Sequence, residues 1–500
     1  MKPSASLFIL ITFLLSFPLA NGYDLEESAD ANGTQKNATS KRAAGERATV
    51  TVDYYQSMNI IGSKFVGVTI DSWHFQAYWN GFPFSSKKVQ NLARAMAPNI
   101  LRIGGTSADK LSYDMSGHAP PFNGWTFLVT PESWQTINQF VRDVGWDFII
   151  DLNALKRNAD GSWNPDNARE LLQFSAHRKY TIAGFELGNE YDMYQGQFNT
   201  TVSPQQLAKD VASLKRLLAE FPAYSSSFIV GPEVAAARPE YFHSFLAAGG
   251  AKVVDAASFH HYYYPDTNTD PNLFTSIKTM DTFYRYALDP AMTQSRQVDP
   301  QLPVWLSETS STYVNGVHNV ADRFVAGFLW LDKLGLCALH GVKAVIRQDL
   351  YGETYSILDK NGDPRPDYWL TVLYKRIVRG HVFLATARQD VRVYSACANH
   401  QHFAAGSLAV YMLNPNSFPV TFDLPQFSSQ PRMIYTLTGW DGDRLSQYTS
   451  LNGVKLELVN DELPKMQARV ASPGHVTAPP YSFTFVVFHH AHIPLCLDRQ

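Results

Sequence analysis

The chain is poor in cysteine and in charge, and after its first residues it has no long apolar run. Charged residues make up 17% of the 500 positions and the formal net charge is −3. This balance argues against a general polyanion-binding surface and against nucleic acid as a partner. No run beyond the N-terminus reaches the roughly 18 apolar residues of a membrane-spanning helix. No membrane span is therefore expected.

The sequence also lacks a nucleotide-binding loop. No Gly-x-Gly-x-x-Gly follows the first predicted strand, so a dinucleotide site is unsupported, and we expect neither a cofactor nor a metal. Apolar residues are abundant instead: 45% of the chain is hydrophobic and 13% is aromatic. A composition of this kind can bury a large core and excludes a disordered or fibrous protein.

Three cysteines are present. A bridge between Cys397 and Cys496 would join the end of the chain to the start of its last domain, as an oxidising compartment permits. Cys337 lies in an apolar helical run and is expected to be a small buried side chain.

The N-terminus has the pattern of a signal peptide over residues 1–22. Lys2 precedes an apolar run from Leu7 to Phe17, and small residues follow up to Gly22. We therefore expect a secreted, extracellular protein, with a lysosomal location as the alternative. Residues 23–46 are polar and are predicted to be flexible. Glycan acceptor motifs begin at Asn32, Asn37 and Asn199.

Apolar, β-prone runs alternate with amphipathic segments across the centre of the chain. Eight such runs are Phe65 to Asp71, Asn99 to Thr106, Asp147 to Asn153, Gly184 to Glu190, Phe228 to Val234, Asp255 to Tyr264, Val304 to Ser311 and Ala344 to Leu350. Strands that alternate with helices form parallel sheets with right-handed crossovers. Eight such units predict an α/β fold, a (β/α)8 TIM barrel, over residues 61–375.

A smaller all-β sandwich is predicted to follow the barrel, over residues 376–500. Short alternating runs separated by Gly, Pro and Asn turns are typical of such a domain. The early strand within residues 47–60 is expected to join this sandwich. The chain is thus predicted to pair a barrel with a discontinuous β domain.

Two glutamates stand where buried strands are predicted to end. Glu190 closes the run Gly184-Phe-Glu-Leu-Gly-Asn-Glu190, and Glu308 lies in Val304-Trp-Leu-Ser-Glu-Thr-Ser-Ser311. In a barrel the carboxyl ends of all strands open on one face, where chemistry is done. Each glutamate alone is ordinarily an ion-pair partner at a strand end. Two at matching strand ends favour function, since an idle buried charge is costly.

Facing carboxyl groups suit the cleavage of a glycosidic bond. One must protonate the leaving oxygen while the other attacks the anomeric carbon or activates water. We assign the acid/base role to Glu190, because Asn189 beside it can hold a sugar hydroxyl, and the nucleophile role to Glu308. A gap of about 5 to 5.5 Å and retention of configuration are expected. Carboxyl groups on opposite sides of the molecule, or held against a permanent arginine, would contradict this hypothesis.

At this point the chain resembles the heparanase family of retaining endo-β-glucuronidases, which includes mammalian heparanase and leech-type hyaluronidase. The resemblance rests on Phe185 to Glu190, Val304 to Ser311, Leu101-Arg-Ile-Gly-Gly-Thr106, His260-His-Tyr-Tyr263, Trp330 to Leu336 and Asp367-Tyr-Trp369. It implies Glu190 as proton donor, Glu308 as nucleophile and Tyr262 as the nucleophile's hydrogen-bond partner. It also implies that Asp71, Thr106, Asn189, Gln348, Tyr355 and Arg238 contact a glucuronide substrate.

The chain departs from mammalian heparanase in ways that bear on activation and substrate. The stretch from Ser107 to Asp147 is too short for the linker that the mammalian proenzyme loses, so activation by that cut is not expected. Ser307 replaces the usual glycine, and the loop after Glu308 lacks a run of glycines. Basic residues are few: beside Arg238 the candidates are Lys110, Lys156 and Arg157.

The expected partner is a glycosaminoglycan, with heparan sulfate slightly favoured on overall likeness and hyaluronan second. An exo-acting β-glucuronidase and a carbohydrate-binding barrel without catalysis are the remaining alternatives. The sequence indicates no oligomeric state.

Overall fold

The computed structural model describes residues 46–77, 81–117 and 127–497. The predicted signal peptide, nearly all of the segment 23–46, and Asn32 and Asn37 lie outside these residues. No helix in the described part of the chain is both long enough and apolar enough to cross a membrane.

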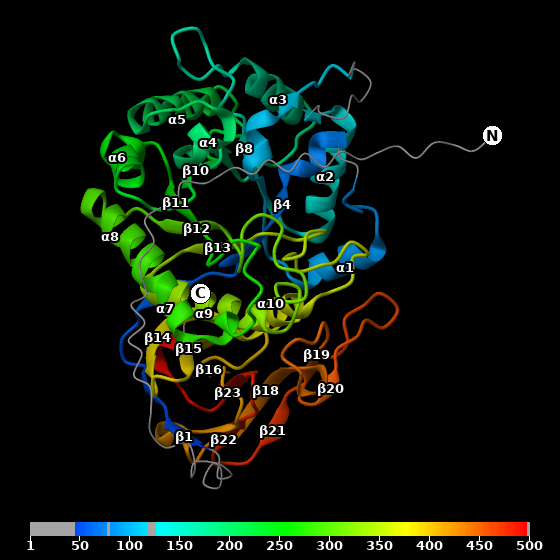
Figure 1. The fold of residues 1–500 in the computed structure, drawn as a ribbon, viewed down its shortest axis with the longest axis vertical. Helices are drawn as coiled ribbons and strands as arrows, with labels where there is room; N and C mark the ends of the chain where they lie inside the picture. The colour runs from blue at the N-terminus through cyan, green and yellow to red at the C-terminus, as the bar shows by residue number, and fades with distance from the viewer. Residues whose placement is uncertain (1–45, 78–80, 118–126, 498–500) are drawn as a thin grey trace, which may run out of the picture.

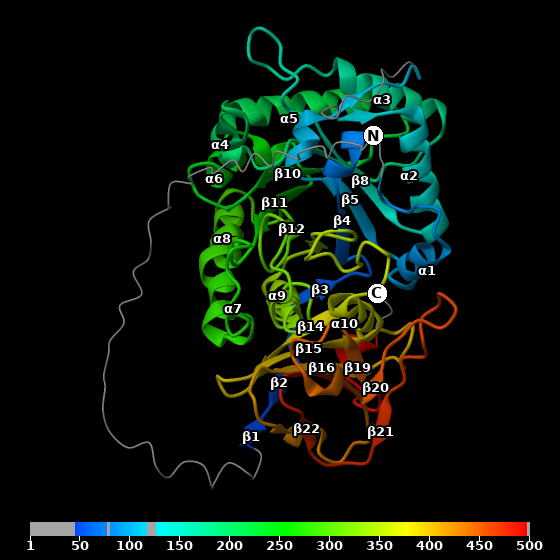
Figure 2. The same cartoon turned by 45° about the vertical axis from the view of Figure 1, so that its right-hand side comes forward.

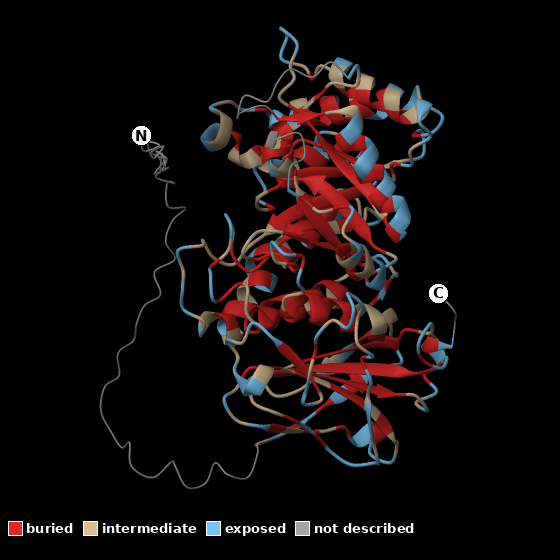
Figure 3. Cartoon of the chain, turned by 90° about the vertical axis from the view of Figure 1, so that its right-hand side faces the viewer, coloured by how far each residue is buried: buried red, intermediate tan, exposed pale blue. Residues whose placement is uncertain are grey.

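Eight parallel strands close into a barrel, so the predicted fold is confirmed (Figure 1). In their order around the barrel they are β4 (Val66–Asp71), β5 (Ile100–Gly104), β8 (Asp147–Leu152), β9 (Gly184–Leu187), β10 (Phe228–Val234), β11 (Ala256–His261), β12 (Val304–Thr309) and β13 (Ala344–Arg347), which pairs with β4. Each coincides with one of the eight apolar runs. The strands are buried on both faces, as parallel strands covered by helices are (Figure 3).

Helices between the strands cover the outside of the barrel (Figure 2). They are α1 (Lys87–Ala95), α2 (Pro131–Val144), α3 (Asp166–His177), α4 (Tyr194–Phe198), α5 (Pro204–Ala219), α6 (Phe242–Ala247), α7 (Ile277–Phe283), α8 (Asp289–Val298), α9 (Ala326–His340) and α10 (Pro366–Ile377). Helix α2 shows how the sequence sets these limits. Thr130 accepts the backbone N–H of Ser133 at its start, and Gly145 ends it with φ 71°.

The C-terminal part is a sandwich of two sheets (Figure 1). The larger sheet contains β14 (Val378–Thr386), β15 (Arg392–Ala398), β16 (Leu408–Asn414), β23 (Ser482–Phe488), β18 (Arg432–Gly439), β19 (Thr449–Leu451), β20 (Val454–Lys455) and β21 (Arg469–Ala471). The smaller one contains β17 (Val420–Asp423) and β22 (Val476–Ala478). A separate pair, β6 (Ser112–Tyr113) and β7 (Leu128–Val129), lies on the barrel side.

The first described residues belong to this sandwich rather than to the barrel. Strand β1 (Glu46–Thr49) pairs with β17, and both β2 (Thr51–Asp53) and β3 (Asn59–Ile61) pair with β14. The sandwich is therefore assembled from the two ends of the described chain.

The barrel and the sandwich share one hydrophobic core. Helices α9 and α10 pack against the large sheet, where Phe324 and Phe328 contact Phe483 and where Tyr374 contacts Tyr411. A second apolar cluster fills the space between the two sheets. The sandwich thus contacts the barrel along one face and closes its own core on the other.

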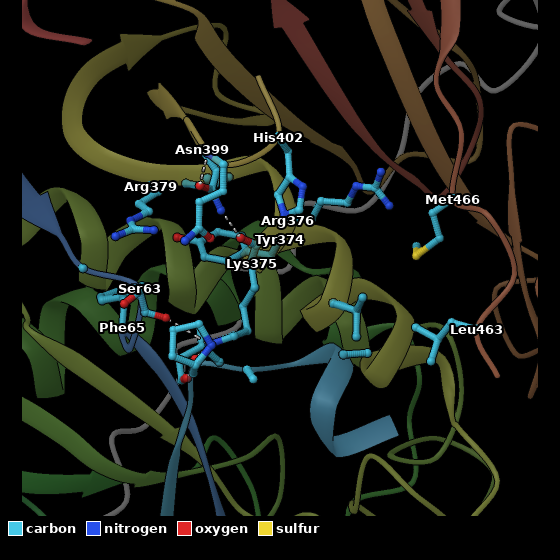
Figure 4. Close-up of a pocket in the computed structure, with 18 of the residues that line it drawn as sticks. Ser63, Phe65, Tyr374, Lys375, Arg376, Arg379, Asn399, His402, Leu463 and Met466 are labelled. Carbon is cyan, nitrogen blue, oxygen red and sulfur yellow. Dashed lines mark hydrogen bonds between the residues drawn. The ribbon is translucent and has the colours of Figure 1, made fainter. Parts of the chain in front are cut away.

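A cavity of about 200 Å³ lies at this junction (Figure 4). Residues that precede β4 and β5 line it together with the end of α10, so it opens at the amino-terminal end of the barrel strands. There the ammonium group of Lys375 donates to the carbonyl oxygens of Ser63, Val66 and Pro98, at 3.2, 3.0 and 2.9 Å. This buried group joins α10 to the base of the barrel.

The structure contains the expected disulfide between Cys397 and Cys496, and Cys337 is a buried free thiol. The bridge closes a loop of 99 residues inside the sandwich. In the chain-entropy account, a loop of this length stabilises the folded state by about 4 to 5 kcal/mol.

We predict that reduction of this bridge destabilises the sandwich before the barrel. Limited proteolysis of the reduced protein should then cut first within residues 376–500, with mass spectrometry locating the cuts. The Cys337→Ala variant, which keeps the bridge, serves as the control. Recovery of free thiols at both Cys397 and Cys496 from protein made under oxidising conditions would contradict the prediction.

Candidate functional site

The carboxyl ends of the barrel strands gather the polar residues that the sequence placed at strand ends. This mouth is at the end of the barrel opposite the cavity at the sandwich junction. Glu190 follows β9 and Glu308 lies in β12, the fourth and seventh strands of the barrel. One carboxyl oxygen of each, together with a ring nitrogen of His260, lie within 4.8 Å of one another.

Glu308 is bonded through both of its oxygens. The Tyr262 hydroxyl donates to Oε1 at 2.6 Å, and Nη1 of Arg102 donates to Oε2 at 2.7 Å. Burial raises the pKa of Glu308, but the charges of His260 and Arg102 and these two hydrogen bonds outweigh it. The pKa of Glu308 therefore lies below its usual range, and the group is a carboxylate at neutral pH.

The arginine contact calls for a correction to the sequence-based criterion. An arginine against either glutamate was expected to contradict the hypothesis, yet Arg102 forms an ion pair with Glu308. The criterion applies only to a proton donor, because a nucleophile must be ionised in order to attack. Arg102 also forms ion pairs with Glu186 and Glu233, so its charge is not devoted to Glu308 alone. Its contact is with Oε2 of Glu308, whereas Oε1 accepts from Tyr262.

Arg102 is the centre of a buried network. Besides Glu308, its guanidinium donates to Glu186 at 2.7 Å, to the side-chain oxygen of Asn189 at 3.0 Å and to Glu233 at 3.1 Å. The side chain is fully buried. A buried guanidinium is tolerated only when its donors are matched by acceptors of opposite charge, and here they are.

The charges of this network balance. Burial and the neighbouring acids raise the pKa of Asp151 well above its usual range and that of Glu186 to about 8. Burial raises the pKa of Glu233, but His260 and Arg102 bring it down to about 2. At neutral pH two carboxylates, Glu233 and Glu308, thus face the cation Arg102 and an imidazole.

That imidazole belongs to His260, which bridges the acids. Its Nδ1 is 3.1 Å from Oε1 of Glu190, and its Nε2 is 2.8 Å from Oε2 of Glu233. Burial lowers the pKa of His260, but the Glu308 charge and the bonds to Glu190 and Glu233 raise it well above its usual range. The imidazolium supplies the second positive charge, and both of its N–H groups donate.

Glu190 is the more exposed of the two candidate catalytic groups, with 16% of its side chain accessible against 8% for Glu308. Its backbone is left-handed, with φ 57°, and its N–H donates to the Glu233 carbonyl at 2.6 Å. Glu233 is also left-handed, with φ 51°. Such conformations are costly for side chains other than glycine and gather at functional sites.

The other predicted site residues surround Glu308. Asp71 accepts from the Gln348 side chain at 2.9 Å, and burial, followed by the Glu308 charge, raises the pKa of Asp71 to about 7. Tyr355 is buried close enough for the Glu308 charge to help raise its pKa, after burial itself. Thr106 is partly buried where β5 gives way to a short 3-10 helix (Thr106–Lys110).

Two predicted residues lie apart from the catalytic pair. Arg238 is exposed in the segment after β10, and no hydrogen bond or ion pair joins its side chain to another residue in the described ranges. Asn199 is exposed at the end of α4, as a glycan acceptor must be.

Sequence reasoning missed the network around Arg102. Arg102, Glu233 and His260 were visible as polar residues at strand ends, but their contacts with one another were not foreseen, and Glu186 stands inside an apolar strand. The signal for Arg102 was the glycine two residues on, because a Cβ at Gly104 would lie 2.6 Å from the guanidinium carbon. Gly105, with φ 100°, likewise leaves room for Asp71.

Within the described ranges, Glu190, His260 and Glu308 are also spaced as a metal site could be. Both ring nitrogens of His260 are already bonded to carboxylates, Glu190 and Glu233. An ion could bind only by breaking one of these bonds. The arrangement suits a pair of carboxyl groups that share protons better than a metal site.

Known proteins resemble this chain in sequence. Heparanase of Bos taurus is 30% identical over 501 residues, which cover 88% of this chain and 91% of the relative. Hyaluronoglucuronidase of Hirudo nipponia is 31% identical and covers 89% and 99%. Inactive heparanase-2 of Homo sapiens is 27% identical and covers 92% of each chain.

A solved structure shares the fold. The 4-O-α-L-rhamnosyl-β-D-glucuronidase of Fusarium oxysporum aligns with a TM-score of 0.66 at 16% identity, covering 88% of this chain and 99% of that one. The family model for the N-terminal domain of glycosyl hydrolase family 79 matches residues 47–335. The chain therefore belongs to glycosyl hydrolase family 79, the family of its heparanase relatives, and is a glycoside hydrolase.

Proposed function

We propose that the protein is a secreted, retaining endo-β-glucuronidase that hydrolyses glycosaminoglycan chains, with Glu190 as acid/base and Glu308 as nucleophile. The observation that supports the proposal is that one carboxyl oxygen of Glu190 lies within 4.8 Å of one carboxyl oxygen of Glu308. Inverting enzymes keep their carboxyl groups about 6.5 to 9.5 Å apart to leave room for water, whereas retaining enzymes need only about 5 to 5.5 Å.

In the first step the Glu308 carboxylate attacks the anomeric carbon of the glucuronide. The bond to the leaving oxygen breaks as Glu190 transfers its proton to that oxygen, and a glycosyl ester forms on Glu308. The N–H of His260 stabilises the carboxylate left on Glu190, which it contacts at 3.1 Å. The Glu190 carboxylate then removes a proton from water as the water oxygen attacks the anomeric carbon. The bond from that carbon to Glu308 breaks, which releases the Glu308 carboxylate and gives net retention.

The neighbours of Glu308 divide the remaining tasks. Tyr262 and Arg102 fix the two oxygens of the nucleophile, so that one rotamer faces the sugar. Asp71 and Gln348, bonded to each other, offer an acceptor and a donor to sugar hydroxyls. We propose that the Tyr355 hydroxyl donates to the glucuronide carboxylate.

The natural substrate is proposed from the relatives. Heparanase and hyaluronoglucuronidase are both similar to this chain, and each name points to a glycosaminoglycan. We keep heparan sulfate slightly ahead of hyaluronan, as proposed from the sequence, although the two relatives are about equally similar to this chain, at 30% and 31% identity. Release of oligosaccharides would support endo action, whereas release of single glucuronic acid units would support the exo-acting alternative.

We predict that Glu308→Gln abolishes turnover without unfolding the protein. The loss should exceed about a thousandfold for every β-glucuronide, because no other group can form the covalent intermediate. A reducing-end assay and a circular dichroism spectrum measure the two effects, with Glu132→Gln, an exposed acid on α2, as the matched control. Undiminished turnover would remove this mechanism and favour the carbohydrate-binding alternative.

Glu190→Gln should behave differently. Polysaccharide hydrolysis should fall by about 10² to 10⁴-fold, because the leaving alkoxide lacks its proton. An aryl glucuronide with an acidic phenol needs no such proton, so it should still form the glycosyl-enzyme. A burst of phenol and a mass increase on Glu308 would detect this intermediate. Equal losses for both substrates would contradict the assignment of roles.

We further predict that Gly104→Ala lowers kcat by at least about tenfold. The added methyl must displace the Arg102 guanidinium, which would misplace Glu308, and a misplacement of about 1 Å can cost about a hundredfold in rate. Gly62→Ala is the control, since no atom lies within 4 Å of a Cβ there. Equal kcat values in the two variants would show that Arg102 does not position the nucleophile.

The protein should be most stable in mildly acidic solution. The folded state raises the pKa of Asp109 and Asp192 to about 6, of Asp71 to about 7 and of Glu186 to about 8, in each case chiefly through burial. Unfolded Asp and Glu titrate at about 4, so these four groups hold more protons in the folded state from about pH 4 to 8. Their contribution to stability therefore falls as pH rises through this window. Burial lowers the pKa of Lys375 to about 7 and those of Lys333 and His261 well below their usual ranges, which acts in the opposite direction, and we expect the more numerous acids to outweigh these bases.

Glu233 and Glu308 also act in the opposite direction, because their pKa values are lowered. Their contribution is present above about pH 4 and is lost in stronger acid. We expect Tm to be at least about 3 °C higher at pH 5 than at pH 8, measured by thermal unfolding. A higher Tm at pH 8 would contradict this linkage.

A further inference from the structure

An exposed aromatic side chain stands beside Asp71 at the barrel mouth. Trp73 is 47% accessible, although tryptophan is usually well covered. Its backbone N–H donates to Asp71 at 2.7 Å, and Asp71 in turn accepts from Gln348. Its ring contacts Phe127 at a centroid distance of 5.7 Å. Trp73 is therefore held at the rim of the barrel mouth, where Asp71 links it to Gln348.

Two more exposed apolar residues follow Glu308. Tyr313 is 41% accessible and Val314 is 56% accessible. The Tyr313 ring lies 6.4 Å from that of Tyr262, which bonds the nucleophile. Val314 has φ 70°, a conformation that a β-branched residue rarely adopts, so the loop is held in a strained form.

These residues lie on adjoining loops. Strand β13 pairs with both β12 and β4, so the loops after these three strands are neighbours. The Thr354 N–H donates to the Asn315 carbonyl, and the His74 ring lies 6.3 Å from that of Tyr351. We call this group of exposed residues, Trp73, Tyr313 and Val314, the apolar lip.

The apolar lip has acids near it and one lysine, Lys110, whose Nζ lies 5.2 Å from the centroid of the Phe127 ring that Trp73 contacts. A single lysine that already faces an aromatic ring is a weak match for a densely sulfated chain. The charge of Asp266 reaches Tyr313, and that of Glu353 reaches Asp71. Residues 72–86 and 309–319 contain no Lys or Arg. Arg365, on the third loop, uses Nη1 to donate to the carbonyl oxygens of Glu353, Thr354 and Ser356, so this nitrogen is engaged within the protein.

Sulfate esters need cationic donors, and a desolvated sulfate beside acids is repelled. The flat, apolar face of an uncharged sugar ring instead packs on an aromatic side chain. We propose that Trp73, with Tyr313 and Val314, binds an uncharged sugar ring next to the cleaved glucuronide and selects unsulfated stretches of the chain. This inference rests on the proposed function and reverses the slight preference for heparan sulfate.

Heparosan, which has the heparan backbone without sulfate, isolates the effect of sulfate. The protein should cleave heparosan or hyaluronan with kcat/KM at least about tenfold above that for heparan sulfate. Raising the salt concentration from about 50 to about 200 mM should change kcat/KM for the unsulfated polymers less than about twofold, because few ion pairs form. Faster cleavage of heparan sulfate than of heparosan would overturn the proposal.

Trp73→Ala tests the apolar lip directly. KM for the unsulfated polymer should rise about tenfold with kcat within about threefold, as expected when binding is lost equally from substrate and transition state. β-Glucuronyl fluoride, whose leaving group is a single atom and which therefore occupies only the glucuronide position, should be cleaved as by the wild type. Trp73→Phe should restore most of the affinity, and Tyr55→Ala, an exposed aromatic of the sandwich side, is the control.

These experiments distinguish failure of the proposed function from failure of the apolar lip as a binding site. If the wild-type protein cleaves neither polymers nor aryl glucuronides, the proposed function fails. If it cleaves them and Trp73→Ala leaves the KM for unsulfated polymer unchanged, only the role of the apolar lip is overturned.

Discussion

The site depends on one buried guanidinium. Arg102 has no access to solvent, and it contacts Glu186, Asn189, Glu233 and Glu308 through its three nitrogens. Removing such a charge from water costs several kcal/mol, which the fold recovers only if the partners are fixed in place. The contacts that offset the desolvation of Arg102 are therefore the same contacts that hold Glu308 in its catalytic position.

Charge balance also explains how a cluster of acids can exist there. Five carboxyl groups lie around Arg102 and His260: Asp151, Glu186, Glu190, Glu233 and Glu308. Because two cations cannot neutralise all of them, the deepest ones, Asp151 and Glu186, keep their protons. The pKa values of Glu233 and Glu308 are lowered instead, so negative charge remains on Glu308, where nucleophilic attack requires it.

Much of the architecture could be read from the sequence. Strands buried on both faces leave continuous apolar runs, so all eight barrel strands were located, and polar residues at their ends marked the mouth. Glu190 and Glu308 were found because a charge at the end of a buried strand is unusual. The roles of Arg102, Glu186 and His260 could not be predicted, since each depends on partners more than 80 positions away or on several at once.

Local conformation was equally hidden. Glu190 and Glu233 have a left-handed backbone. Glutamate rarely adopts this conformation, so no sequence pattern indicated it at these positions. The exposure of Trp73 was also not foreseeable, because an aromatic residue after a strand is more often part of the core.

The path of the chain through the sandwich has a consequence for synthesis. Strands β1 to β3 leave the ribosome before any part of the barrel, yet their partners β14 and β17 begin only at Val378 and Val420. Until those partners emerge, the edges of the first strands have no native neighbour. The barrel segments of a nascent chain are therefore synthesised while β1 to β3 are still unpaired. Unpaired strand edges are prone to aggregation, so this is where a chaperone would protect the chain.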